Sequence, residues 1–236
     1  MSTTAPLMPK ARRPRLGIVT IGQAPRVDLH EDLAALLAPG IEVIERGALD
    51  ALSAEDIERR YPVGDFSNVL VSRLRNGRQV TIAEPDLEPL LDVAIRDTAA
   101  ECDVVIALCT GAIPDYQALS TPVISPARVV RHGLQALFPE GRLIVMSPDA
   151  RQTDSARRRW ETAGFSVATL VASPYGELQP MIEAAERAAR LEADALYLDC
   201  MGYTLGHRML VSAQSGHCVI TPRQLVFGAA NTLFGF

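Results

Sequence analysis

The 236-residue sequence lacks a hydrophobic run of the roughly 18 residues that a membrane helix needs. Basic residues do occur near the start, at Lys10, Arg12 and Arg13, but no apolar segment of signal-peptide length follows them. We therefore expect a cytoplasmic protein with no membrane partner.

An excess of positive charge is also missing, because 23 Lys and Arg stand against 28 Asp and Glu and the formal net charge is −5, so nothing suggests the basic footprint of a nucleic-acid-binding protein. None of the four cysteines forms a Cys-x-x-Cys pair, and their spacing fits no zinc site. Disulfides are not expected in the cytoplasm. The segment GQAPR lacks the glycine spacing and the lysine of a phosphate-binding loop. We predict no metal, no cofactor and no nucleic-acid partner.

What the sequence does contain is a regular alternation of short apolar runs and helical patterns, which predicts an α/β fold with mostly parallel sheets. Asn76-Gly77 lies between two alternating runs and predicts a β-hairpin at about 68–83. Residues 1–14 have neither pattern, and we expect a disordered tail there. Strands are predicted at 15–22, 41–47, 103–109, 121–125, 142–147, 165–171, 195–200 and 217–221, and helices near 28–38, 86–100, 127–137, 153–163, 177–193 and 223–234.

The two halves of the chain repeat one unit. ECDVVIALCTG at 101–111 parallels EADALYLDCMG at 192–202, so that Cys109 and Cys200 each end a strand and precede x-Gly. Further on, VISP and VITP each begin a helix with Ser or Thr as its N-cap and Pro in the first turn. The repeat predicts two pseudo-symmetric lobes, 15–126 with the hairpin insert and 127–222, and a C-terminal helix 223–236 that packs back on the first lobe.

The repeated cysteines are the strongest candidates for chemistry. Ligands bind outside the carboxyl ends of strands in open α/β sheets, and pseudo-symmetry would bring both cysteine strands to the interface between the lobes. A single free cysteine is commonly a small buried residue, but a matched pair favours function. Two thiols that flank a substrate can act as base and acid on opposite faces of one carbon.

Further residues are candidates for binding the substrate. Arg26, after the first strand, either grips a carboxylate through two parallel hydrogen bonds or forms a surface pair with Asp28. If the strand continues through Asp199, this residue points to the face opposite Cys200. The remaining candidates lie beside Arg26 or follow the cysteines: Gln23, Thr110, Gly111, Gly202, Tyr203 and Thr204.

Four segments give the chain a family resemblance: TIGQAPRVD at 20–28, the hairpin insert, LCTG at 108–111 and LDCMGY at 198–203. They resemble the AroM family from about Arg15 to the C-terminus. That family looks like a branch of the aspartate/glutamate racemase superfamily, which includes amino-acid and hydantoin racemases, maleate isomerases and arylmalonate decarboxylases. The resemblance implies a two-lobed fold, catalysis without a cofactor, and one catalytic cysteine from each lobe.

By this resemblance, Cys109 matches the first catalytic cysteine and Cys200 the second. The chain departs from the racemases in two places: Asn does not follow Cys109, and His does not stand two residues after Cys200. These departures count against acidic amino acids as substrates.

We therefore predict a cofactor-independent racemase or isomerase of a small, amino-acid-like carboxylate, with Cys109 and Cys200 as paired acid and base. Two alternatives stay open, namely an enzyme of the maleate isomerase or decarboxylase kind that uses one cysteine, and a non-catalytic small-molecule-binding protein on the same fold. Homodimer formation is also left open.

Overall fold

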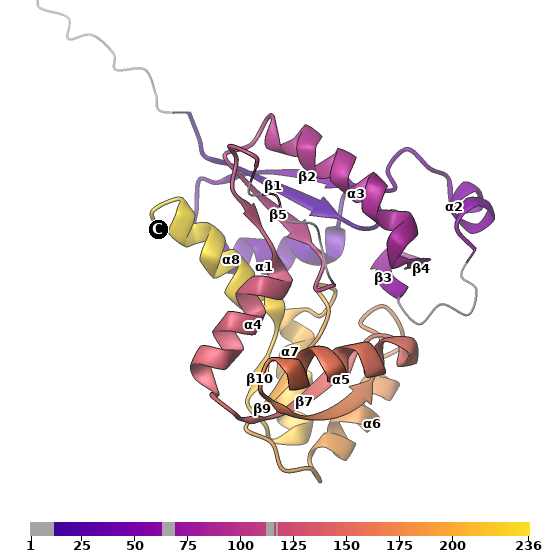
Figure 1. Ribbon diagram of the computed structural model, residues 1–236, viewed down its shortest axis with the longest axis vertical. Helices are drawn as coiled ribbons and strands as arrows, with labels where there is room; N and C mark the ends of the chain where they lie inside the picture. The colour runs from indigo at the N-terminus through magenta and orange to yellow at the C-terminus, as the bar shows by residue number, and fades with distance from the viewer. Residues whose placement is uncertain (1–11, 63–68, 112–115, 117) are drawn as a thin grey trace, which may run out of the picture.

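The computed structural model describes residues 12–62, 69–111, 116 and 118–236, and it shows two lobes, each built on a parallel four-stranded sheet (Figure 1). The first sheet has the strand order β2-β1-β5-β6 and the second β10-β9-β7-β8. Strands of the first sheet are β1 (Arg15–Thr20), β2 (Glu42–Gly47), β5 (Val104–Leu108) and β6 (Val123–Ile124). Those of the second are β7 (Arg142–Ser147), β8 (Ser166–Val171), β9 (Ala195–Leu198) and β10 (Val219–Ile220).

The predicted α/β class, the parallel sheets and all eight strands of these sheets are confirmed. The predicted hairpin is present as β3 (Val69–Arg73) and β4 (Gln79–Ala83), with Gly77 at a positive φ of 88° in its turn. Residues 1–11 of the expected tail lie outside the described residues. Of the rest, Arg12 pairs with Asp103, and the carbonyl of Pro14 accepts a hydrogen bond from the backbone of Glu42.

The helices follow the predicted segments closely, except that α7 (Leu205–Ser215) and the short helix α2 (Ala54–Arg60) lie outside the predicted ranges. The first turn of α2 is capped by Ser53, whose side chain accepts a hydrogen bond from the backbone N–H of Asp56. The others are α1 (His30–Leu36), α3 (Glu84–Ala99), α4 (Pro126–Leu137), α5 (Thr153–Thr162), α6 (Gln179–Ala188) and α8 (Pro222–Leu233).

Helices α4 and α8 pack against each other at the boundary between the lobes, and each holds one lobe by a matched contact (Figure 1). On α8, the Asn231 side chain accepts from the N–H of Ala38 at 3.0 Å and donates to the carbonyl of Leu36 at 2.9 Å, at the end of α1. On α4, the Gln135 side chain donates to the carbonyl of Ala163 at 2.8 Å, at the end of α5. The polypeptide thus crosses twice between the lobes.

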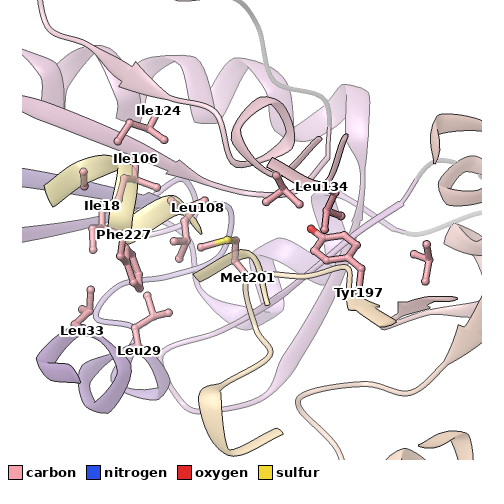
Figure 2. Packing of buried hydrophobic residues seen from close by; sticks show 14 of the residues in the cluster. Ile18, Leu29, Leu33, Ile106, Leu108, Ile124, Leu134, Tyr197, Met201 and Phe227 are labelled. Atoms are coloured by element: carbon pink, nitrogen blue, oxygen red, sulfur yellow. The ribbon is translucent and has the colours of Figure 1, made fainter. Parts of the chain in front are cut away.

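The apolar core runs through this boundary. Figure 2 shows Ile18, Ile106 and Phe227 on the first-lobe side, with Met201 lying between them and Tyr197. Separate clusters fill the outer face of each sheet, one beneath α3 and one beneath α6 and α7. Because one cluster is shared, the two lobes cannot separate without exposing apolar surface, at roughly 25 cal/mol per Å².

A buried arginine in the first turn of α8 crosses the same boundary. Arg223 is 0% exposed, and its guanidinium forms ion pairs with Asp32 at 2.7 Å and Asp28 at 3.3 Å, both in the first lobe. It also donates to the carbonyls of Met201 at 2.8 Å and Gly202 at 3.1 Å, which belong to the loop after Cys200. One side chain therefore fixes the position of the second cysteine loop relative to the first lobe.

Replacing this arginine should destabilise the fold strongly. Arg223→Met leaves two buried carboxylates without their cation, and breaking a buried ion pair in this way costs roughly 3–5 kcal/mol. Urea unfolding should show that loss, while Arg158→Met, at an exposed position of α5, should change the free energy of unfolding by less than about 0.5 kcal/mol. A loss below about 1 kcal/mol for Arg223→Met, typical of a surface pair, would contradict this role.

Candidate functional site

A cavity of about 390 Å³ lies where the carboxyl ends of β5 and β9 meet, and both Cys109 and Cys200 line it. Its wall takes residues from both lobes and from the hairpin strand β3. The repeat therefore brings the two cysteines to one site. Among the predicted binding residues, Arg26, Thr110 and Gly111 also line this cavity.

The two cysteine turns have the same local geometry. The backbone N–H of Gly111 donates to the sulfur of Cys109 at 3.2 Å, and that of Gly202 donates to the sulfur of Cys200 at 3.3 Å. The backbone N–H of each cysteine also bonds to the carbonyl two residues before it, at 2.7 and 2.9 Å. Each Cys-x-Gly unit is thus a tight turn that holds the sulfur against a backbone donor.

Both glycines also leave room for a side chain that covers the turn. A Cβ on Gly202 would lie 2.4 Å from the hydroxyl oxygen of Tyr175, and one on Gly111 would lie 2.7 Å from a methyl group of Leu70. Such distances are too short for a real Cβ, so a larger residue at either position would have to displace the covering side chain. At Cys200 the Tyr175 hydroxyl lies 4.0 Å from the sulfur, whereas the Cys109 turn is covered by Leu70, with the Glu84 carboxylate close to Gly111.

The surroundings shift the ionisation of both thiols. Burial raises the pKa of Cys109 to about 12, against the partial compensation of the Gly111 N–H. Burial also raises the pKa of Cys200, where the Gly202 N–H, the Arg26 guanidinium and the Tyr175 hydroxyl act in the opposite direction. In the free protein at neutral pH, Cys109 is therefore a thiol.

Arg26 is 3% exposed, and its guanidinium is committed to protein groups. It donates to both carboxylate oxygens of Asp28, at 2.8 and 2.7 Å, to the hydroxyl of Thr20 at 3.0 Å and to that of Tyr175 at 3.2 Å. Of the two roles considered for Arg26, the structure shows the pairing with Asp28, although the pair is buried and not on the surface. The planar fork that could bind a substrate carboxylate is occupied by Asp28.

Four of the predicted binding residues lie outside the cavity lining, and each has a contact in the fold. Gln23 donates to the carbonyls of Leu49 and Leu52, and Tyr203 donates to the carbonyl of Ala172 at 2.5 Å. The other two belong to the turn and to the helix that follows it. Gly202 donates to the Cys200 sulfur, and Thr204 caps α7 in a reciprocal pair with His207.

The alternation of a continued strand predicted that Asp199 would point away from the cavity, and this prediction is wrong. Asp199 lines the cavity and pairs with Arg159 of α5, because β9 ends at Leu198 and the alternation of faces stops there. One oxygen of its buried carboxylate has no hydrogen-bond partner among the described residues.

The sequence also did not single out Tyr175, Arg159 or two buried serines of the cavity wall, Ser72 and Ser147. Both serine hydroxyls are without a hydrogen-bond partner in the described part of the chain. Unpaired buried hydroxyls are rare in native proteins and commonly mark a place where a ligand or water completes the bonding. Within that part of the chain, no cluster of three or more His, Cys, Asp or Glu could hold a metal ion, and no helix is long and apolar enough to cross a membrane.

Several solved structures share this fold at low sequence identity. Allantoin racemase from Klebsiella pneumoniae is 16% identical with a TM-score of 0.57, and the match covers 94% of this chain and 87% of the other. Maleate isomerase from Pseudomonas putida is 15% identical with a TM-score of 0.59, covering 94% and 92%. Glutamate racemase RacE1 from Bacillus anthracis is 14% identical with a TM-score of 0.60, covering 94% and 81%.

These likenesses confirm the aspartate/glutamate racemase-like fold that the sequence predicted. A comparison with curated proteins found no match. The family model described as AroM protein matches residues 16–234, which is almost the whole chain. The protein therefore belongs to the AroM family.

Proposed function

We propose that the protein is a cofactor-independent racemase or isomerase that acts on a small carboxylate-bearing, amino-acid-like molecule, with Cys109 and Cys200 as the paired acid and base. The observation that carries this proposal is that the cysteines of two matching Cys-x-Gly turns, one from each lobe, line a single cavity. Its fold neighbours include racemases and an isomerase, which is consistent with this class of reaction.

The chemistry needs one thiolate that removes a proton from the carbon and one thiol that delivers a proton to the opposite face. The structure favours Cys200 as the resting base. A polar hydroxyl and the Arg26 cation stabilise its thiolate, whereas Leu70 covers the Cys109 turn. Cys109, with its pKa raised to about 12, is suited to hold the proton that it donates. In the reverse direction the two cysteines exchange roles.

The cavity wall also fits a carboxylate. Four arginines and two carboxylates line it, which makes the lining net positive, although Asp28 occupies the fork of Arg26 and Asp199 pairs with Arg159. The hydroxyls of Ser72 and Ser147 can each donate a hydrogen bond to an anion. As the Cα proton leaves, the substrate carboxylate gains enolate character, and donors fixed in a buried site stabilise that charge better than water does.

A second candidate is an isomerase or decarboxylase that uses one cysteine. The unequal surroundings of the two sulfurs favour it, because only the Cys200 sulfur has a side-chain hydroxyl nearby in the described part of the site. In that case Cys200 is the reacting group and Cys109 serves the shape of the cavity. The two candidates differ in what they predict for the cysteine variants below.

Alkylation of Cys109 should depend steeply on pH. Only the thiolate reacts with iodoacetamide, so a pKa of about 12 predicts a rate that rises about tenfold per pH unit between about pH 7 and 10. Mass spectrometry of the digested protein measures the rate at this one cysteine. A short unstructured peptide with one cysteine serves as the control, because an ordinary thiol pKa of about 8.5 makes its rate level off above about pH 9.5. A plateau for Cys109 in the same range would show that its thiolate is stabilised.

Replacing either cysteine tests the mechanism. In deuterium oxide, NMR follows Cα–H exchange over a panel of amino acids and hydroxy acids, and chiral chromatography follows inversion. Cys109→Ser and Cys200→Ser should each lower racemisation in both directions by roughly 10²–10⁴-fold, because a hydroxyl is a far weaker acid than a thiol. Exchange of the Cα proton without inversion should survive in each variant, on the face of the substrate that still has a cysteine beside it.

Cys218→Ser is the matched control, because Cys218 is exposed and lies outside the cavity lining, and it should keep full activity. If Cys109→Ser alone keeps near-native turnover, the one-cysteine candidate replaces the paired mechanism. If no compound in the panel exchanges its proton, racemisation of these substrate classes is ruled out.

A further inference from the structure

A side cavity of about 70 Å³ opens next to the cysteine cavity, and three arginines line it. Arg128 and Arg131 lie one turn apart on α4, and Arg159 lies on α5. The two cavities share the three arginines and Ala127, together with Thr110, which follows Cys109, and Asp199, which precedes Cys200. A group bound in the side cavity therefore belongs to a molecule that can also reach both sulfurs.

The donors of this side cavity exceed its acceptors. Arg159 uses one terminal nitrogen for Asp199, and Arg131 forms no ion pair with any carboxylate of the described residues. Trp160 also lines the cavity and is 3% exposed, yet its indole N–H has no acceptor in the described part of the chain. An unpaired donor at this depth costs free energy unless a ligand or water accepts its hydrogen bond.

The chemistry of these donors selects an anion. Guanidinium groups bind the planar oxygens of carboxylates and phosphates through paired hydrogen bonds, and an indole can only donate. About 70 Å³ exceeds the roughly 10–15 Å³ that one water needs on this measure, so a group of several atoms fits. The two departures from the racemase pattern lie in the loops after Cys109 and Cys200, whereas these donors belong to α4 and α5.

We propose that the side cavity lined by Arg131, Arg159 and Trp160 is a subsite for a second anionic group, a carboxylate or a phosphate. The substrate is then a dianion. Its first carboxylate is attached to the reacting carbon, which lies between the two cysteines. This inference rests on the proposed function for the place of the reacting carbon, but the binding of the second anion is tested without any turnover.

Trp160 is the sole tryptophan of the chain, so its fluorescence reports directly on this subsite. The probes are succinate, with two carboxylates, 3-phosphonopropionate, with a carboxylate and a phosphonate, and butyrate, a monocarboxylate of similar length. A dianion should change the Trp160 emission saturably and bind at least about tenfold more tightly than butyrate, since a hydrogen bond to a charged group is worth roughly 1.5–3 kcal/mol. The better of the two dianions identifies the group that the subsite takes.

Arg131→Gln should weaken binding of the preferred dianion at least about tenfold and leave butyrate unaffected. Arg131 is exposed on α4, so this variant should fold normally. Arg158→Gln removes the same charge from an exposed site on α5 outside both cavities, and it should bind like the native protein.

Equal affinity for succinate, 3-phosphonopropionate and butyrate, an unchanged Trp160 spectrum with both dianions, or native affinity in Arg131→Gln would each overturn the subsite. Failure of the proposed function has a different signature. In that case the dianions still bind and Arg131→Gln still weakens them, but the cysteine variants do not alter proton exchange.

Discussion

The buried Arg223–Asp28–Asp32 network is the interaction on which the candidate site depends. Arg223 ties α8 to the first lobe and at the same time holds the carbonyls of the loop after Cys200. Burial disfavours the ionised form of Asp28, but Arg26 and Arg223 outweigh that effect and lower the pKa of this carboxyl group. Asp28 also orients Arg26, which bonds the hydroxyl of Tyr175 beside the Cys200 sulfur. A single carboxylate thus links the lobe boundary, the second cysteine loop and its polar cover.

The pseudo-symmetry explains why a cavity forms, and its imperfections explain what the cavity can do. Matched strands and matched Cys-x-Gly turns bring equivalent backbone donors to the two sulfurs. The covers of the two turns come from non-equivalent segments: Leu70 belongs to the hairpin, which has no counterpart in the second lobe, and Tyr175 follows β8. The symmetric part brings two thiols to one cavity, and the asymmetric part gives the two sulfurs different surroundings.

The sequence predicted the elements of this site better than its contacts. The repeat around Cys109 and Cys200 and the Asn76-Gly77 turn are local patterns, and local patterns determined the strands, the hairpin and the pair of cysteines. Helix α2 was missed, although Ser53 is an ordinary N-cap residue that could have marked its start. The role of Arg26 could not be decided from the sequence, because both of its roles use the same guanidinium fork, and only the folded structure shows that Asp28 occupies it.

Other features are out of reach of any local pattern. Asp199 lines the cavity because β9 ends one residue before it, and strand ends cannot be predicted to that accuracy. Tyr175 precedes α6 in an aperiodic segment, and its place over Cys200 depends on Gly202, which lies far away in the chain. Arg131, Arg159 and Trp160 come together only because α4 crosses from the first lobe to pack beside α5.

Substrate charge and thiol ionisation are coupled in such a site. An anion that enters a buried cavity disfavours a nearby thiolate, since like charges repel strongly where water is excluded. Burial already raises the pKa of both cysteines, so an uncompensated anion would suppress the base that the reaction needs. Arginines that bind the anion cancel its repulsion of the thiolate. They can do so only for a ligand whose anionic groups reach the arginines. Charge recognition in the side cavity would then select the substrate and, by the same contacts, permit the thiolate to form.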